Sequence, residues 1–355
     1  MIGWGVQGPR SIGPLRDQIV AAFCSVPKVA DSDLLKPVDP SSCADWESYR
    51  EKRDQIAAPL RGKNWDELDH EQRSECLQNQ SYLSPAAFRY FLPAFLLSSL
   101  EDEDFAWSTV VRVSPNFCEI HHGGRDAALD ARIADLDAAQ YRAVVTFLTW
   151  LADGPNRFAV RYRAIECLKW GWTREGVDEA RIRSFYQRVH SYRRPVIGDE
   201  PREMLARLVE DAFAETPYPG DETIVGHHCE ECCEIGVEFI GADWRSVDPD
   251  FLRYYHAAPS LFSPEAFRYF FPAYVLCDLA GNSAFTSSGS FHLSYGVEPG
   301  HEAHERSLAR WKIFSDRERC ALIAYLELAW DDGKSFEAEN LRIALDSYWL
   351  PSVSR

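Results

Sequence analysis

The segment His227-His228-Cys229-Glu230-Glu231-Cys232-Cys233-Glu234 is the one local concentration of metal-ligating side chains in the sequence. A Cys-x-x-Cys pair preceded by histidine offers ligand types that tetrahedral Zn²⁺ accepts, so His228, Cys229 and Cys232 are candidate zinc ligands. Two features argue against zinc. No second Cys or His pair lies at a zinc-ribbon distance, and the corresponding stretch near Cys43 lacks the cluster. The sequence therefore predicts no cofactor, with zinc as the open alternative.

Other catalytic patterns fail on spacing. His301 and His304 are three residues apart, whereas the helical zinc-protease motif needs histidines four apart. Nucleophile-elbow, Walker and dinucleotide-binding glycine patterns are absent. The acidic run 101–104 is typical of a solvated loop. We predict no catalytic residues. The alternative is a metal-assisted hydrolase near His228, completed by His301 or His304.

A long apolar motif, which is expected to lie in a protein core, occurs twice in the sequence. Leu83-Ser84-Pro85-Ala86-Ala87-Phe88-Arg89-Tyr90-Phe91-Leu92-Pro93-Ala94-Phe95 recurs as Phe262-Ser263-Pro264-Glu265-Ala266-Phe267-Arg268-Tyr269-Phe270-Phe271-Pro272-Ala273-Tyr274. The same spacing carries Trp65 onto Trp244. Such a repeat predicts tandem duplication of one domain. We expect copies at residues 1–172 and 201–355, joined at 173–200 by a basic, aromatic and helical connector.

Each copy of the motif predicts a central helix. A serine caps it, proline fills its first turn, and apolar residues follow at helical spacing. A second proline predicts a kink or a break into two short helices. The arginine in the apolar run needs a carboxylate or a freed carbonyl as partner. The signature positions are Ser84, Pro85, Phe88, Arg89, Tyr90 and Pro93, and Ser263, Pro264, Phe267, Arg268, Tyr269 and Pro272.

The remaining elements predict a mostly α fold with minor β structure. Amphipathic helices are expected to open each copy, and late helices are expected to begin after Asp137 and Ser315. Residues 107–113 and 290–295 alternate as short strands do. Isolated cysteines among apolar residues are expected to be small buried hydrophobes; these are Cys24, Cys76, Cys167, Cys277 and Cys320.

Charge and hydropathy limit the partners. The formal net charge is −17, with 55 acidic and 38 basic side chains, which disfavours direct nucleic-acid binding and favours a basic protein partner. The start lacks the pattern of an export signal, and no apolar run approaches the roughly 18 residues of a membrane span. These features predict a cytoplasmic protein without membrane association.

The repeated motif, with Gly-Lys-Asn-Trp65 or Gly-Ala-Asp-Trp244 before it and an apolar helix after it, resembles an uncharacterised family of small bacterial domains. The resemblance covers both copies and leaves out the connector. Domains of this family usually occur singly, so the tandem form departs from the pattern. The resemblance implies a fold and assigns no catalytic residues.

Taken together, these features favour a non-catalytic protein-binding module. Its most concrete form is a bacterial immunity or inhibitor protein whose acidic surface neutralises a toxin. A regulatory scaffold, in which one copy binds a partner and the other supports it, is a further alternative.

Overall fold

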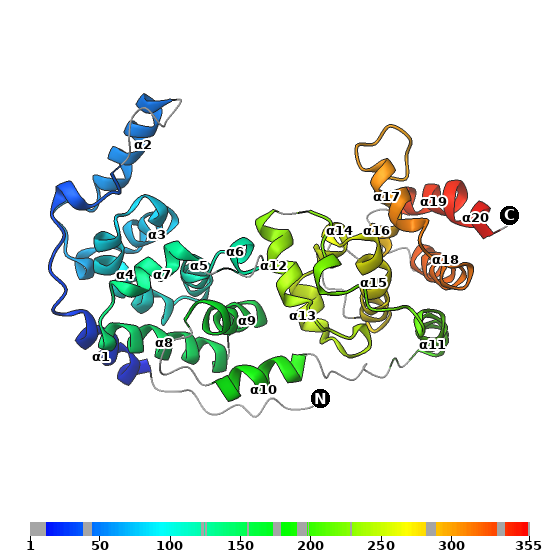
Figure 1. Ribbon diagram of the computed structural model, residues 1–355, viewed down its shortest axis with the longest axis horizontal. Coiled ribbons are helices and arrows are strands. Elements are labelled where there is room, and N and C mark those ends of the chain that lie inside the picture. Colours follow the sequence, from blue (N-terminus) through cyan, green and yellow to red (C-terminus); the bar gives the residue numbers. More distant parts are fainter. Residues whose placement is uncertain are drawn as a thin grey trace. The chain divides into compact units, whose positions relative to one another are not determined.

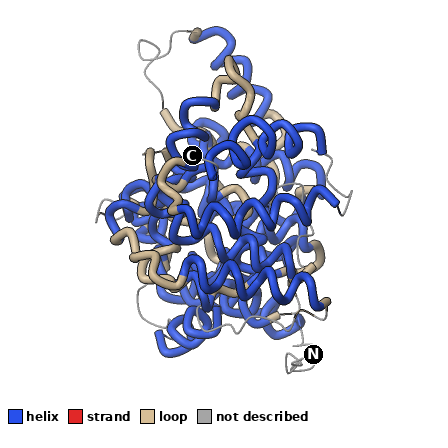
Figure 2. Tube along the Cα trace, turned by 90° about the vertical axis from the view of Figure 1, so that its right-hand side faces the viewer, coloured by secondary structure: helices blue, strands red, loops and turns tan. Residues whose placement is uncertain are grey.

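The chain folds as two compact units, residues 1–182 and 183–355. The computed structural model describes residues 12–37, 45–121, 124, 126–154, 156–172, 179–189, 197, 199–227, 229–281, 289–331 and 338–353. The boundary falls inside helix α10 (Glu179–Val189), within the stretch expected to connect the two copies (Figure 1). Helices and loops make up the described residues, with no strand among them (Figure 2).

The helices have the following bounds. Unit 1 contains α1 (Ile12–Phe23), α2 (Trp46–Ala57), α3 (His70–Gln78), α4 (Pro85–Ser99), α5 (Glu103–Val113), α6 (Phe117–His121), α7 (Ala127–Ala134), α8 (Ala138–Asp153) and α9 (Phe158–Glu166). Unit 2 contains α11 (Glu200–Phe213), α12 (Glu230–Glu238), α13 (Pro249–Tyr254), α14 (Ala258–Leu261), α15 (Pro264–Leu279), α16 (Gly289–Ser294), α17 (His304–Trp311), α18 (Asp316–Asp331), α19 (Ala338–Ala344) and α20 (Leu350–Val353). A π-helical turn extends α9 as η5 (Cys167–Gly171), and another follows α19 as η8 (Leu345–Trp349).

The core of each unit is built on a central helix. In unit 1, α4 packs against α1 and α5, and α1 packs against α8. In unit 2, α15 packs against α11, and α11 packs against α18. Phe91 and Phe95 of α4, and Phe270 and Phe271 of α15, are almost completely buried. Burial of these aromatic side chains is the main driving force that fixes the central helices.

Both central helices begin in the same way. The Oγ atom of Ser84 accepts a hydrogen bond from Ala87 N–H at 3.1 Å and donates one to the carbonyl of Asp33 at 2.5 Å. Ser263 accepts from Ala266 N–H at 3.1 Å and donates to a carbonyl at 2.5 Å. The hydroxyl therefore caps the helix and ties it to the preceding segment.

The expectation of two short strands is wrong. Residues 107–113 lie in α5, and most of 290–295 lies in α16. In α5 the buried residues Phe105, Thr109 and Val113 recur every four positions, so one helical face covers the core. Apolar alternation over so short a stretch fits a helix equally well, and the Asp102 cap decides for the helix.

Two further expectations are corrected. Pro93 and Pro272 each lie inside one continuous helix, so the alternative of a break into two short helices is wrong, and the kink stays a prediction. Proline removes one backbone donor, and burial of the helix on several sides compensates for that loss. Cys24 and Cys320 are exposed and not buried, whereas the other isolated cysteines, Cys76, Cys167 and Cys277, are buried.

In the part of the chain that the structure describes, no helix has both the length and the apolar character needed to span a bilayer.

Candidate functional site

The signature arginines join the central helix of each unit to the start of the late helix. In unit 1, Arg89 Nε donates to Gln140 Oε1 at 2.9 Å, and its guanidinium lies 4.0 Å from Asp137. Gln140 is buried and also completes the capping box that begins α8. Arg89 thus holds α4 against the first turn of α8 through a neutral amide.

The matching junction of unit 2 is ionic. Arg268 Nε donates to both carboxylate oxygens of Glu318, at 3.0 and 2.9 Å. Glu318 also accepts from Thr216 Oγ1 at 2.8 Å and from Ser315 N–H at 2.7 Å. This carboxylate is buried, and its donors come from three separate segments. Arg268 therefore has the carboxylate partner expected from the sequence, and its role is to hold the helices together.

The other signature residues also stabilise the fold. The guanidinium carbon of Arg132 lies 4.8 Å from the ring centroid of Phe88, and that of Arg310 lies 5.5 Å from the ring of Phe267. Such cation–π contacts stabilise a packed aromatic ring. Tyr90 donates to the side chain of Asn64 at 3.3 Å. The repeated motif thus provides packing and polar anchors for each unit.

The predicted zinc ligands occupy the start of α12. Cys229 is the exposed N-cap residue, Cys232 is buried, and their Sγ atoms lie 2.9 Å apart. His228 lies outside the described residues. Within the described part of the chain, no group of three or more His, Cys, Asp or Glu side chains is placed to hold a metal ion. The structure brings the two cysteines together, and zinc binding stays a prediction.

The histidines proposed to complete a hydrolase site have backbone partners. His301 Nδ1 accepts from Ala303 N–H at 3.0 Å, and His304 Nδ1 lies 2.9 Å from the carbonyl oxygen of Gly296. The two rings therefore stabilise the loop that precedes α17.

A third histidine, His292, which the sequence did not single out, is buried. His292 Nε2 lies 3.3 Å from the carbonyl oxygen of His256, and its Nδ1 lies 3.3 Å from Ser260 Oγ. Since a carbonyl only accepts, Nε2 carries the proton and Nδ1 accepts from the serine. Burial lowers the pKa of His292 to about 3, with the nearby Arg310 charge as a smaller cause. His292 is therefore a neutral packing residue.

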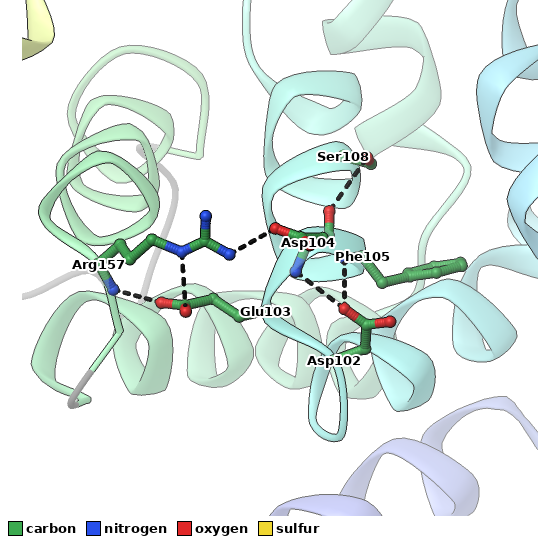
Figure 3. A network of polar contacts seen from close by, with 6 residues as sticks. All are labelled: Asp102, Glu103, Asp104, Phe105, Ser108 and Arg157. Atoms are coloured by element: carbon green, nitrogen blue, oxygen red, sulfur yellow. Dashed lines mark hydrogen bonds and ion pairs between the residues drawn. The ribbon is translucent and has the colours of Figure 1, made fainter. Parts of the chain in front are cut away.

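The acidic run 101–104 begins in the turn after α4, as expected, and its second half forms the start of α5 (Figure 3). Asp102 caps the helix by accepting from two backbone N–H groups at 2.9 and 3.1 Å. Glu103 accepts from Arg157 Nε at 2.9 Å, and Asp104 pairs with the same guanidinium. These carboxylates serve to start a helix and to join it to the loop before α9.

The surface of α11 carries two exposed apolar side chains. Met204 and Leu208 are 62% and 43% exposed, although they lie on a helix whose opposite face is buried. They are one turn apart, and Glu200 and Asp211 extend the same face with exposed carboxylates. We call these four residues the α11 stripe. The α11 stripe thus combines an exposed apolar pair with exposed carboxylates on one face of the helix.

The sequence held a signal for this stripe that was missed. Leu205, Val209 and Phe213 already supply the buried face of α11, at helical spacing. Met204 and Leu208 are additional apolar residues on another face, one turn apart. The sequence of α11 therefore contains more apolar residues than its one buried face requires.

The fold and these sites define an all-α protein of two compact units, as far as the structure describes the chain. Residues 15–174 match the model of a family of unknown function (DUF6714). The match covers most of unit 1, and it agrees with the resemblance to an uncharacterised family. No curated protein matches the chain, and no solved structure does.

Proposed function

We propose that the chain is a protein-binding module without catalytic activity of its own, and that it binds a basic partner through the α11 stripe. The carrying observation is the exposure of Met204 and Leu208 between the carboxylates of Glu200 and Asp211. A basic amphipathic helix would place apolar side chains on the exposed pair and its Lys or Arg side chains against the carboxylates.

The charges around the stripe support a basic partner. Arg202 and Arg207, the basic residues of α11, each pair with an acidic residue of the same segment, at 3.5 and 3.2 Å. The segment 199–215 carries more acidic than basic residues and keeps a negative net charge. Long-range attraction to a positively charged partner would raise the association rate.

The specific form that we propose is an immunity or inhibitor protein that covers a basic surface of a bacterial toxin. The formal net charge of −17 supports this form, because a basic catalytic cleft attracts an acidic protein.

We also infer that the units are duplicated copies of one domain. The serine caps, the arginine junctions and the π-helical turns at matching places support duplication. Only unit 2 carries the stripe: counting back from Phe23 and Phe213, unit 1 has Pro14 and Gln18 where unit 2 has its apolar pair. This difference supports a division of roles in which unit 2 binds the partner protein and unit 1 supports unit 2.

A peptide titration tests the binding surface. A fluorescent synthetic Leu/Lys amphipathic helix is titrated with the full chain, and a scrambled peptide serves as the ligand control. We expect the Met204→Ser/Leu208→Ser double variant to bind about tenfold more weakly than the wild type. Val20→Ser is the matched protein control, because Val20 is 38% exposed on α1. Equal binding of the wild type and the double variant would overturn the proposal.

Growth assays test the inhibitor form. The chain is co-expressed with the product of the neighbouring gene in its genome. Rescue of growth by the wild type, together with loss of rescue in the Met204→Ser/Leu208→Ser variant, would support an immunity role. Rescue that is unchanged in the variant would place the inhibitory surface elsewhere.

A further inference from the structure

Helix α12 begins with two thiols, one at the surface and one directly beneath it. Cys229 is exposed at the N-cap, and Cys232, one turn later, is completely buried. Their Sγ atoms are 2.9 Å apart, and a disulfide bond needs about 2.05 Å. Bond formation therefore requires a movement of less than about 1 Å.

The two thiols have different chemical environments. The Cys229 sulfur is open to solvent and accepts a hydrogen bond from the Cys232 backbone N–H at 3.3 Å. Cys232 is enclosed by the protein, with 0% of its surface exposed. The first turn of a helix also favours a thiolate, because its free N–H groups carry partial positive charge. Cys229 is thus the accessible nucleophile, and Cys232 is the enclosed neighbour within reach of it.

We propose that Cys229 and Cys232 form a thiol–disulfide exchange site that reacts with small neutral or cationic disulfides. The Cys229 thiolate attacks one sulfur of the disulfide, forms a mixed disulfide and releases the first thiolate. Cys232 then gives its proton to the released thiolate and attacks Cys229 Sγ. The bond between Cys229 and the small thiol breaks, the protein disulfide forms and the second thiolate leaves. Two protein thiols are oxidised while one small disulfide is reduced to two thiols, so no other oxidant is needed.

The charges at the helix start determine the class of substrate. Glu230 and Glu231 are exposed in the first turn of α12, beside the accessible sulfur. Their carboxylates repel an anionic disulfide such as oxidised glutathione and attract a dication such as cystamine. Salt screens this effect, because the Debye length is about 10 Å at 0.1 M ionic strength.

Two cysteines elsewhere in the chain serve as internal controls. Cys24 and Cys320 are exposed, and the local sequence of each holds no second cysteine within three residues. They can form mixed disulfides, but they have no adjacent thiol in sequence to displace the small thiol. Their reaction rates report ordinary surface cysteines under the same conditions.

The experiment uses the reduced full chain with cystamine and, in parallel, with oxidised glutathione. Disulfides are mapped by alkylation and peptide mass spectrometry over time. We expect Cys229 to react about tenfold faster than Cys24 or Cys320. The product should be the Cys229–Cys232 disulfide, and cystamine should react about threefold faster than oxidised glutathione, with the difference shrinking at high salt.

Two variants separate the steps. Cys232→Ser should stop at a stable mixed disulfide on Cys229, and Cys229→Ser should leave the buried Cys232 unmodified. The proposal is overturned if the wild type accumulates the mixed disulfide, or if Cys229 reacts no faster than Cys24. It is also overturned if the purified protein holds about one equivalent of zinc that Cys232→Ser loses, because the thiols would then be metal ligands.

Discussion

Arg268 Nε lies 2.9 Å from Oε2 of Glu318, and the Glu318 side chain is only 2% exposed. In unit 1 the matching arginine, Arg89, donates to the amide oxygen of Gln140. The hydrogen-bond partner of the signature arginine is therefore a carboxylate in unit 2 and a neutral amide in unit 1. The free-energy cost of losing a partner is large for a buried carboxylate, which needs its charged partner and its other donors. The same cost is much smaller for an amide.

The first prediction compares truncation of the two junctions. Glu318→Ala removes the partner of Arg268 and should destabilise unit 2 by about 3–5 kcal/mol. Gln140→Ala removes a neutral partner and should lower the free energy of unfolding of unit 1 by about 1–3 kcal/mol. Denaturant unfolding followed by hydrogen exchange assigns each loss to its unit. Equal losses would show that the charge of Glu318 adds nothing.

The second prediction concerns the serine caps. Ser84→Ala and Ser263→Ala should each lower the free energy of unfolding by about 1–2 kcal/mol, because an N–H cap and a carbonyl tie are lost together. Threonine at either position keeps the hydroxyl and should recover most of the loss. Thermal unfolding of the four variants checks this, and a loss that threonine fails to reduce would argue against capping.

The third prediction follows from His292. Its pKa is lowered to about 3 by burial, whereas the unfolded chain has a value near about 6.5. Between these values the unfolded state binds the proton more strongly, so the stability of the folded state falls as the pH drops below about 6.5. The slope approaches about 1.4 kcal/mol per pH unit.

His292→Gln isolates this effect, because the glutamine amide can still donate to the carbonyl of His256. The difference in unfolding free energy between wild type and variant should change between pH 7 and pH 4, in favour of the variant at low pH. A difference that stays constant with pH would show that His292 has the same pKa in the folded and the unfolded state.

The fourth prediction has the opposite sign. Burial raises the pKa of Asp278 to about 6, against hydrogen bonds from Tyr325 and Gly289 that lower it. The folded state then binds the proton more strongly than the unfolded chain, whose value is about 3.9. The resulting stabilisation is complete below about pH 4 and is lost as the pH rises through about 6. Burial also raises the pKa of Asp248 to about 6, so the deprotonation of Asp248 adds to this loss of stability.

Asp278→Asn should therefore remove part of the fall in stability that deprotonation causes between pH 4 and pH 7, and Asp248→Asn should remove a further part. Urea unfolding at several pH values measures both. Parallel stability curves for the wild type and the Asp278→Asn variant would contradict a raised pKa.

The fifth prediction concerns the charges of the α11 stripe. Glu200→Gln and Asp211→Asn should weaken binding of the basic peptide at low salt and reduce its salt dependence. Stability should change by less than about 0.5 kcal/mol, because both side chains are on the surface. Affinities measured at two salt concentrations check this, and an unchanged salt dependence would remove these carboxylates from the interface.

Helix starts and buried helix faces could be predicted from the sequence. Ser84 and Ser263 begin their helices as expected, because capping and the first-turn proline are local chemistry. The strand expected at residues 107–113 is wrong, because a short apolar alternation fits both the strand period and the helix period, and the capping carboxylate of Asp102 favours the helix.

The contact partners of the predicted site residues could not be predicted from local sequence patterns. Glu318 lies fifty positions from Arg268 along the chain, and only the packing of α18 near α15 brings the two together. The cysteine pair was visible in the sequence, but the exposure of Cys229 and the burial of Cys232 depend on how α12 packs.

The two faces of α11 consist of separate sets of positions, so one set can change in evolution or by engineering while the other stays the same. Its inner residues, Leu205, Val209 and Phe213, belong to the core, whereas Met204 and Leu208 have no part in it. Random replacement of the stripe should therefore yield a library in which nearly every member folds. Such a library could be selected for new specificities on an unchanged scaffold.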